Sequence, residues 1–186
     1  MADLEELYRE IILDHYRSPR NRGELESPPA HRVEGFNPLC GDEVVLSMLV
    51  EGDTLADLKI AGSGCSISQS SASLMSAAVK GKPVDQVRQL ISTFKGMMSV
   101  HEASLGHEAH DGHGHGHDGS APAALRHQHD GNGAEVVPGE PEEIDLDKLG
   151  ELAALQGVVK FPVRIKCATL SWNALAQGLD EVAAGA

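Results

Sequence analysis

Apolar residues recur with helical spacing at the start of the chain. From Leu4 to His15 they stand three and four residues apart, which predicts an amphipathic helix. Asp3 and Glu6 have the spacing of a capping box at its start. Pro19 is expected to end it, because the residue before a proline is pushed out of the helical region.

Three short runs of a different kind follow a polar loop. The segments 31–36, 43–50 and 55–60 are candidate strands, of which 43–50 is the richest in β-branched residues, and Glu51–Thr54 has the composition of a tight turn. Short strands in succession with tight links predict an antiparallel sheet of three strands.

Helical spacing returns after Gly62–Gly64. We expect a helix over 66–80, a second beginning at Pro83, a short one around 146–157 ended by Gly157, and a last one opened by Pro162. The order predicts an α+β fold, in which helices pack on one face of a small three-stranded antiparallel sheet.

The pattern is interrupted between about 101 and 141. Gly, His, Asp, Ala and Pro dominate this stretch, and no apolar period survives in it. We therefore interpret 1–186 as a single domain with a low-complexity insertion. Its histidines could store metal or supply it to the cysteines, but a solvated, variable insertion is the preferred interpretation. They are His101, His107, His110, His113, His115, His117, His127 and His129.

Composition narrows the classes of function. The formal charge of the 186 residues is −13 and the pI about 5.1, which argues against binding to nucleic acid or to an anionic membrane. The first residues do not have the pattern of a signal peptide, and no apolar stretch is long enough to span a bilayer. Three cysteines are an odd number. We expect a cytoplasmic protein with reduced thiols.

The three cysteines stand in settings that favour chemistry. Cys40 and Asp42 are separated by one glycine, so a thiolate and a carboxylate come from one loop. Cys65 directly precedes a predicted helix, whose N-terminal dipole favours a thiolate. Cys167 lies early in the last helix, and Arg164, three residues before it, is a candidate to favour the thiolate or to stabilise an anion.

Three thiolates and one carboxylate from Cys40, Asp42, Cys65 and Cys167 make a set suited to zinc. Iron or an iron–sulfur cluster also suits the sulfur majority. From spacing alone this metal site is no better supported than three small buried thiols, because the paired spacing of a zinc ribbon is absent.

Three longer motifs around these residues carry a family resemblance. They are the segment Phe-Asn-Pro-Leu-Cys-Gly-Asp at 36–42, the Ser-rich stretch at 62–75, and Phe-Pro-Val-Arg-Ile-Lys-Cys within 161–172. Together they resemble the U-type iron–sulfur assembly proteins, the family of IscU, SufU and the N-terminal part of NifU. The likeness covers nearly all of the chain outside the His-rich stretch. Lys166 stands where scaffold members carry a His, and this favours the SufU type.

The resemblance implies a function and a site. Members of the SufU type bind zinc through the residues that match Cys40, Asp42, Cys65 and Cys167, and they take persulfide sulfur from a SufS-type cysteine desulfurase. The residue that matches Cys40 accepts the sulfur after a histidine of the desulfurase displaces it from zinc. We thus expect a zinc-dependent sulfurtransferase, with Cys40, Asp42 and Arg164 as candidate catalytic residues, that serves a downstream iron–sulfur scaffold. The alternatives are a scaffold on which the cluster itself forms, and a structural zinc domain that makes protein contacts.

Overall fold

A computed structural model describes residues 2–105 and 149–185 of the chain. Three strands, β1 (His31–Asn37), β2 (Asp42–Glu51) and β3 (Thr54–Ser63), form one antiparallel sheet in the order β1-β2-β3. The predicted strands and their order are confirmed. Residues 44–48 of the central strand are all buried, so both faces of β2 are covered at this point.

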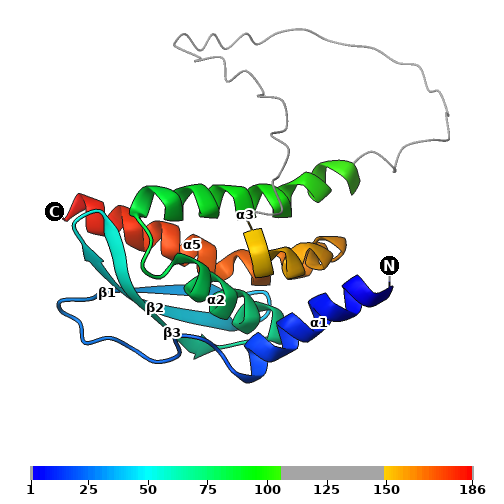
Figure 1. The fold of residues 1–186 in the computed structure, drawn as a ribbon, viewed down its shortest axis with the longest axis horizontal. Helices are drawn as coiled ribbons and strands as arrows, with labels where there is room; N and C mark the ends of the chain where they lie inside the picture. Colours follow the sequence, from blue (N-terminus) through cyan, green and yellow to red (C-terminus); the bar gives the residue numbers. More distant parts are fainter. Residues whose placement is uncertain (1, 106–148, 186) are drawn as a thin grey trace, which may run out of the picture.

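Helices pack against one face of the sheet in two layers. The inner layer is α2 (Ser66–Val79) with α5 (Pro162–Ala184), and both contact the strands. The outer layer is α1 (Ala2–Arg17), α3 (Val84–Leu105) and the 3₁₀ helix η1 (Gly150–Lys160). Figure 1 shows α5 lying between the sheet and α3. The predicted α+β fold with helices on one face is confirmed.

The core between these layers is built mainly from aliphatic side chains. Trp172 of α5 is fully buried and stacks on Phe94 of α3, with 4.3 Å between the ring centroids. The stack joins the two layers of helices, in a protein whose sequence contains few aromatic residues. Trp172 is therefore a core residue. Other fully buried large side chains are Leu46, Met48, Leu55, Leu58, Met75, Met98, Leu152, Leu155 and Leu175.

Three predicted element boundaries differ from the structure. Helix α1 begins at Ala2, so residue 3 lies inside its first turn and not at the cap. Helix α3 runs to Leu105, into the first residues of the expected insertion. Gly157 does not end η1, which continues to Lys160 because Val158 and Val159 beyond the glycine are buried in the core.

The rest of the insertion, and the side chains of all eight of its histidines, lie outside the described part of the molecule. Among the helices that the structure describes, none is long and apolar enough to cross a membrane.

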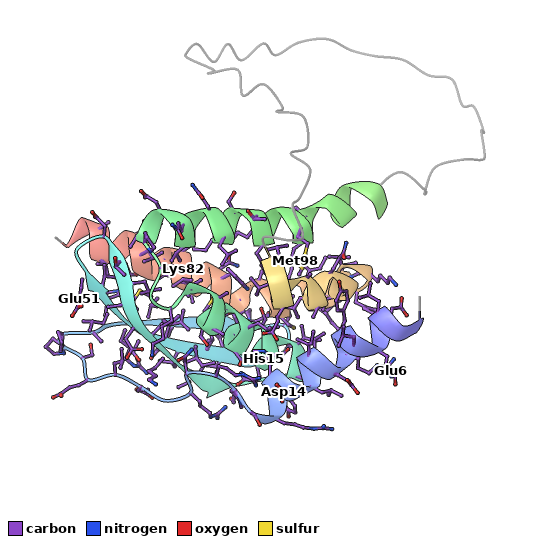
Figure 2. The ribbon with its side chains drawn as sticks, viewed as in Figure 1. Glu6, Asp14, His15, Glu51, Lys82 and Met98 are labelled. Atoms are coloured by element: carbon purple, nitrogen blue, oxygen red, sulfur yellow. The ribbon has the colours of Figure 1, made fainter. Side chains whose placement is uncertain are left out.

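Buried hydroxyl groups of α2 connect the helices to one another. We call the cluster of His15, Ser71, Ser73, Ser76 and Trp172 the serine interface. Ser73 Oγ lies 2.7 Å from His15 Nδ1 and also accepts the Arg20 N–H at 2.8 Å. Ser71 donates to the Ala168 carbonyl at 2.6 Å and accepts the Trp172 indole N–H at 3.2 Å. His15 lies where α1 meets α2 (Figure 2).

The buried serines of α2 are small enough to let the helices approach closely, and their hydroxyls are hydrogen-bonded. Ser76 Oγ, for example, accepts from the Asn21 amide at 3.1 Å and contacts the Arg20 carbonyl at 3.2 Å. Each such pair avoids the cost of about 1–3 kcal/mol for a buried polar group without a partner.

Candidate metal centre

The cysteines converge because of the strand directions. In an antiparallel sheet the last residues of β1, the first of β2 and the last of β3 lie at the same end of the sheet. Asn37 ends β1 opposite Asp42 at the start of β2, and Ser63 at the end of β3 pairs with Glu43. Helix α5 brings Cys167 to this end of the sheet. We call the group of Asn37, Cys40, Asp42, Cys65 and Cys167 the cysteine pole.

Two thiols and one carboxylate meet directly at the pole. The Sγ atoms of Cys40 and Cys167 are 3.5 Å apart, and a carboxylate oxygen of Asp42 joins them in a group whose ligand atoms all lie within 4.8 Å of one another. Asp42 and Cys167 are 2% and 4% exposed, whereas Cys40 is exposed. Within this group of three, Asp42 and Cys167 are thus buried and Cys40 is the exposed member.

Cys65 contacts this group from the side of Asp42. Its Sγ lies 3.5 Å from Asp42 Oδ2, and its backbone N–H donates to Asp42 Oδ1 at 2.9 Å. It is also the N-cap of α2, where its sulfur accepts the Ser68 N–H at 3.4 Å. Cys65 is exposed and does not belong to the group of three, so the structure brings it to Asp42 but not to both other sulfurs.

Two glycines make this arrangement sterically accessible. Gly41 has φ +72°, which lets the chain turn sharply between Cys40 and Asp42. A Cβ on Gly64 would stand 2.7 Å from Asp42 Oδ1 and 2.5 Å from Ser68 Oγ. The structure thus brings the Cys40 thiol and the Asp42 carboxylate together through a tight turn.

Burial and hydrogen bonding set the charge states at the pole. Burial acts to raise the pKa of Asp42, but hydrogen bonds from the Cys40 thiol and from the Cys65 backbone and thiol, with that of Cys167, outweigh it and hold the pKa below its usual value. Burial raises the pKa of the Cys167 thiol far above its usual value, and its hydrogen bonds with Cys40 and Asp42 add to this effect. Asp42 is therefore ionised, and Cys167 favours the protonated thiol in the absence of a nearby cation.

Two contacts at the pole have spacings close to those between ligands of a tetrahedral zinc ion. With Zn–S near 2.3 Å and Zn–O near 2.1 Å, tetrahedral geometry sets neighbouring sulfurs about 3.8 Å apart and a sulfur about 3.6 Å from an oxygen. The Cys40–Cys167 and Cys65–Asp42 contacts, both 3.5 Å, are close to these spacings.

Arg164 does not contact Cys167 in the structure. Its guanidinium carbon lies 5.9 Å from the centroid of the Phe161 ring. Together with Arg9 and Lys160 it lines a cavity of about 480 Å³ with an apolar floor that includes Ile12, and Ser66 beside Cys65 also lines this cavity. The guanidinium thus stands at a neighbouring cavity and not at the sulfurs.

Exposed apolar side chains lie close to the cysteines in the sequence. Phe36 and Leu39 precede Cys40 and are 64% and 67% exposed; Phe161 and Val163 begin the region of α5 that carries Cys167 and are 58% and 69% exposed. Large apolar side chains left this open near a reactive group are typical of a surface that another protein covers.

Sequence reasoning did not single out Asn37. It is buried, and its amide nitrogen lies 4.0 Å from Cys167 Sγ. The available signal was its place three residues before Cys40 in the first motif.

Comparison with known proteins finds relatives among the iron–sulfur assembly proteins. Residues 7–117, more than half of the chain, match the family model of the NifU-like N-terminal domain. The chain is 39% identical over 184 residues to a zinc-dependent sulfurtransferase SufU of Bacillus subtilis, covering 99% of this chain and 97% of the relative. It is 31% identical over 183 residues to an iron–sulfur cluster assembly scaffold protein IscU of Streptococcus pyogenes, covering 98% and 89%.

A solved structure supports the fold. The N-terminal part of a nitrogen-fixing NifU-like protein from Brucella abortus superposes with a TM-score of 0.67, covering 98% of this chain and 99% of that one at 17% identity. At this identity the similarity shows the fold.

Proposed function

The protein belongs to the family of NifU-like N-terminal domains, and on that premise we propose that it is a zinc-dependent sulfur acceptor in iron–sulfur cluster assembly. The observation that carries the proposal is the cysteine pole, where an exposed Cys40 thiol stands 3.5 Å from the buried Cys167 thiol and beside the ionised Asp42.

Cys40, Asp42, Cys65 and Cys167 would hold the zinc ion. Bound there, zinc would keep the thiols deprotonated without any redox chemistry of its own. Completion of the set of four requires the Cys65 side chain to turn toward the other two sulfurs, and its exposure leaves room for this. Asp42 holds the backbone of Cys65 next to the site, because its carboxylate accepts the Cys65 N–H.

Cys40 is the residue that accepts sulfur. Its side chain is exposed, whereas Cys167 is buried and the Cys65 sulfur is engaged by the N-terminus of α2. The Cys40 thiolate attacks the outer sulfur of a persulfide on the donor; the donor's S–S bond breaks, the donor cysteine leaves as a thiolate, and Cys40 becomes the persulfide. No electrons are gained or lost overall, so the step needs no reductant.

The donor in this proposal is a cysteine desulfurase of the SufS type, and the product passes to a downstream iron–sulfur scaffold in the cytoplasm, where thiols stay reduced. The exposed side chains of Phe36, Leu39, Phe161 and Val163 supply a docking surface next to the acceptor. Arg164 contributes an exposed positive charge at the adjacent cavity, which would attract an acidic group of the partner.

The scaffold function is the second candidate, and it is supported by the relative that is named a scaffold protein. The same cysteines would then receive iron and sulfide. A purely structural zinc domain fits less well, because two of the three cysteines are exposed and structural zinc sites are closed.

One experiment separates these functions. The zinc-loaded protein is incubated without oxygen with a cysteine desulfurase and cysteine, and its peptides are then analysed by mass spectrometry. The proposal predicts one added sulfur on the peptide that contains Cys40, lost in Cys40→Ser, and none on the peptides with Cys65 or Cys167. Sulfur on another cysteine, or a coloured cluster that forms when iron is also supplied and passes to an acceptor protein, would contradict it.

A further inference from the structure

Asn37 occupies the point where the two halves of the cysteine pole meet. It is the last residue of β1, it pairs with Asp42 across the hairpin, and it is only 7% exposed. A buried amide at a ligand-bearing turn must find partners for both its oxygen and its nitrogen, because either one left alone costs about 1–3 kcal/mol.

The oxygen atoms of Asn37 hold the turn that presents Cys40. The side-chain Oδ1 accepts the Leu39 N–H at 3.1 Å. The backbone carbonyl accepts the N–H of Gly41 at 2.8 Å and that of Cys40 at 3.4 Å. One residue thus supplies the acceptors for three successive N–H groups between β1 and β2.

The nitrogen of the same amide faces the other half of the pole. Because Oδ1 is committed to Leu39, the opposite end of the amide carries the N–H donors, and Nδ2 lies 4.0 Å from Cys167 Sγ. The sulfur also lies 3.5 Å from the Cys40 thiol, which is a weak donor, and 3.9 Å from the Val163 carbonyl, which can only accept. Within residues 2–105 and 149–185, the Asn37 amide is therefore the side-chain N–H group that faces the Cys167 sulfur.

We infer that Asn37 is a positioning residue for the metal centre, with two separable roles: its oxygens shape the Cys40 turn, and its amide N–H orients and stabilises the Cys167 thiolate as a ligand. The inference rests on the proposed metal site and deepens it. It explains how the two neighbouring thiols differ. The Cys167 sulfur faces the amide N–H of Asn37, whereas the Cys40 side chain is exposed. Cys40 is then the ligand that can dissociate from the metal and accept sulfur. Groups that hold ligands in this way typically cost 10–100-fold in metal affinity when they are replaced.

Two substitutions test the amide role without removing the turn. Asn37→Asp keeps an oxygen for the Leu39 N–H but has no amide donor, and Asn37→Ser keeps an oxygen without adding charge. Agreement between the two variants excludes an effect of charge alone. Asn21→Asp is the matched control, because the Asn21 amide also donates to a buried partner, Ser76, away from the pole.

The readouts are the zinc dissociation constant by competition with a chelator and the thiolate-to-metal absorption of the cobalt(II)-substituted protein. We expect both Asn37 variants to bind zinc about 10–100-fold more weakly, with a shifted cobalt absorption, while Asn21→Asp matches the native protein in both. A merely structural role would lower the melting temperature of the metal-free protein and leave the cobalt absorption unchanged.

Native affinity and native absorption in both Asn37 variants would overturn the inference alone. Failure of the native protein to load zinc or cobalt at the pole would overturn the proposed function together with it. If one variant does not fold, the other still decides the question.

Discussion

The serine interface and the cysteine pole are both polar clusters set against the same helix, α2, but they are built differently. In the interface, strong hydrogen bonds of 2.6–3.2 Å pair donors with acceptors, as in Ser71 with Ala168 and Trp172. At the pole, the contacts that involve sulfur are longer, 3.5–4.0 Å, and two thiols face each other in Cys40 with Cys167. The first arrangement joins helices; the second brings together candidate metal ligands.

This difference teaches where each property of the protein resides. Stability should depend on the interface, because its side chains are fully buried and each makes a hydrogen bond to another part of the protein. Affinity for a cation should depend on the pole, and substitutions there should change stability mainly through the bound ion.

The largest effect is expected from Trp172→Ala. It removes the ring that stacks on Phe94 and the N–H that reaches Ser71, and large-to-small changes of a fully buried aromatic cost about 3–5 kcal/mol. Urea unfolding should show this loss in the metal-free and the zinc-loaded protein alike. Trp172→Phe, which keeps an aromatic ring, should lose much less. A full rescue of Trp172→Ala by zinc would break the separation of the two regions.

A smaller, opposite pattern is expected from Gly64→Ala. The added Cβ would meet the Asp42 carboxylate and the Ser68 hydroxyl, so Asp42 must move away from the cysteines. Zinc affinity, measured by chelator competition, should fall about 10–100-fold, as for other changes that misplace a ligand. Stability of the metal-free protein should change little. Gly96→Ala is the control, because nothing lies within 4 Å of a Cβ there; equal affinities for both variants would count against the pole as a metal site.

The smallest effect is a pH dependence that comes from His15. Burial, with the positive charge of Arg20, lowers the pKa of His15 below 6.5, although Glu151 and Asp14 act in the other direction. The unfolded chain therefore binds the proton more readily than the folded one between the folded pKa and 6.5. Stability should be complete above pH 6.5 and fall as the pH drops through this window. Urea midpoints from pH 8 to 5 should show the slope, and His15→Gln should flatten it; an unchanged slope in the variant would refute the assignment.

Much of this comparison could be predicted from the sequence. The β-branched residues of 43–50 and the turn residues at 51–54 predicted the strands, and the motifs around Cys40, Cys65 and Cys167 marked the pole. The strand directions could then have placed Asp42 and Cys65 at the same end of the sheet, because in an antiparallel sheet successive connections alternate between its two ends.

The remainder depends on tertiary contacts that no local pattern carries. Ser71 and Ser73 look alike in the sequence, yet one bonds α5 and the other bonds α1 and the following loop. The continuation of η1 past Gly157 depends on the burial of Val158, which overrides the weak helix propensity of glycine. Arg164 is three residues from Cys167, but its guanidinium group lies over the ring of Phe161 instead.

X-ray absorption at the zinc edge, on protein loaded with one zinc per chain, examines the ligand set itself. If zinc is bound by Cys40, Asp42, Cys65 and Cys167, the spectrum should show three sulfurs about 2.3 Å and one oxygen about 2.0–2.2 Å from the zinc. A shell made mainly of nitrogen, with the outer scattering of imidazole rings, would place the ion on histidines and would contradict a metal centre at the cysteine pole.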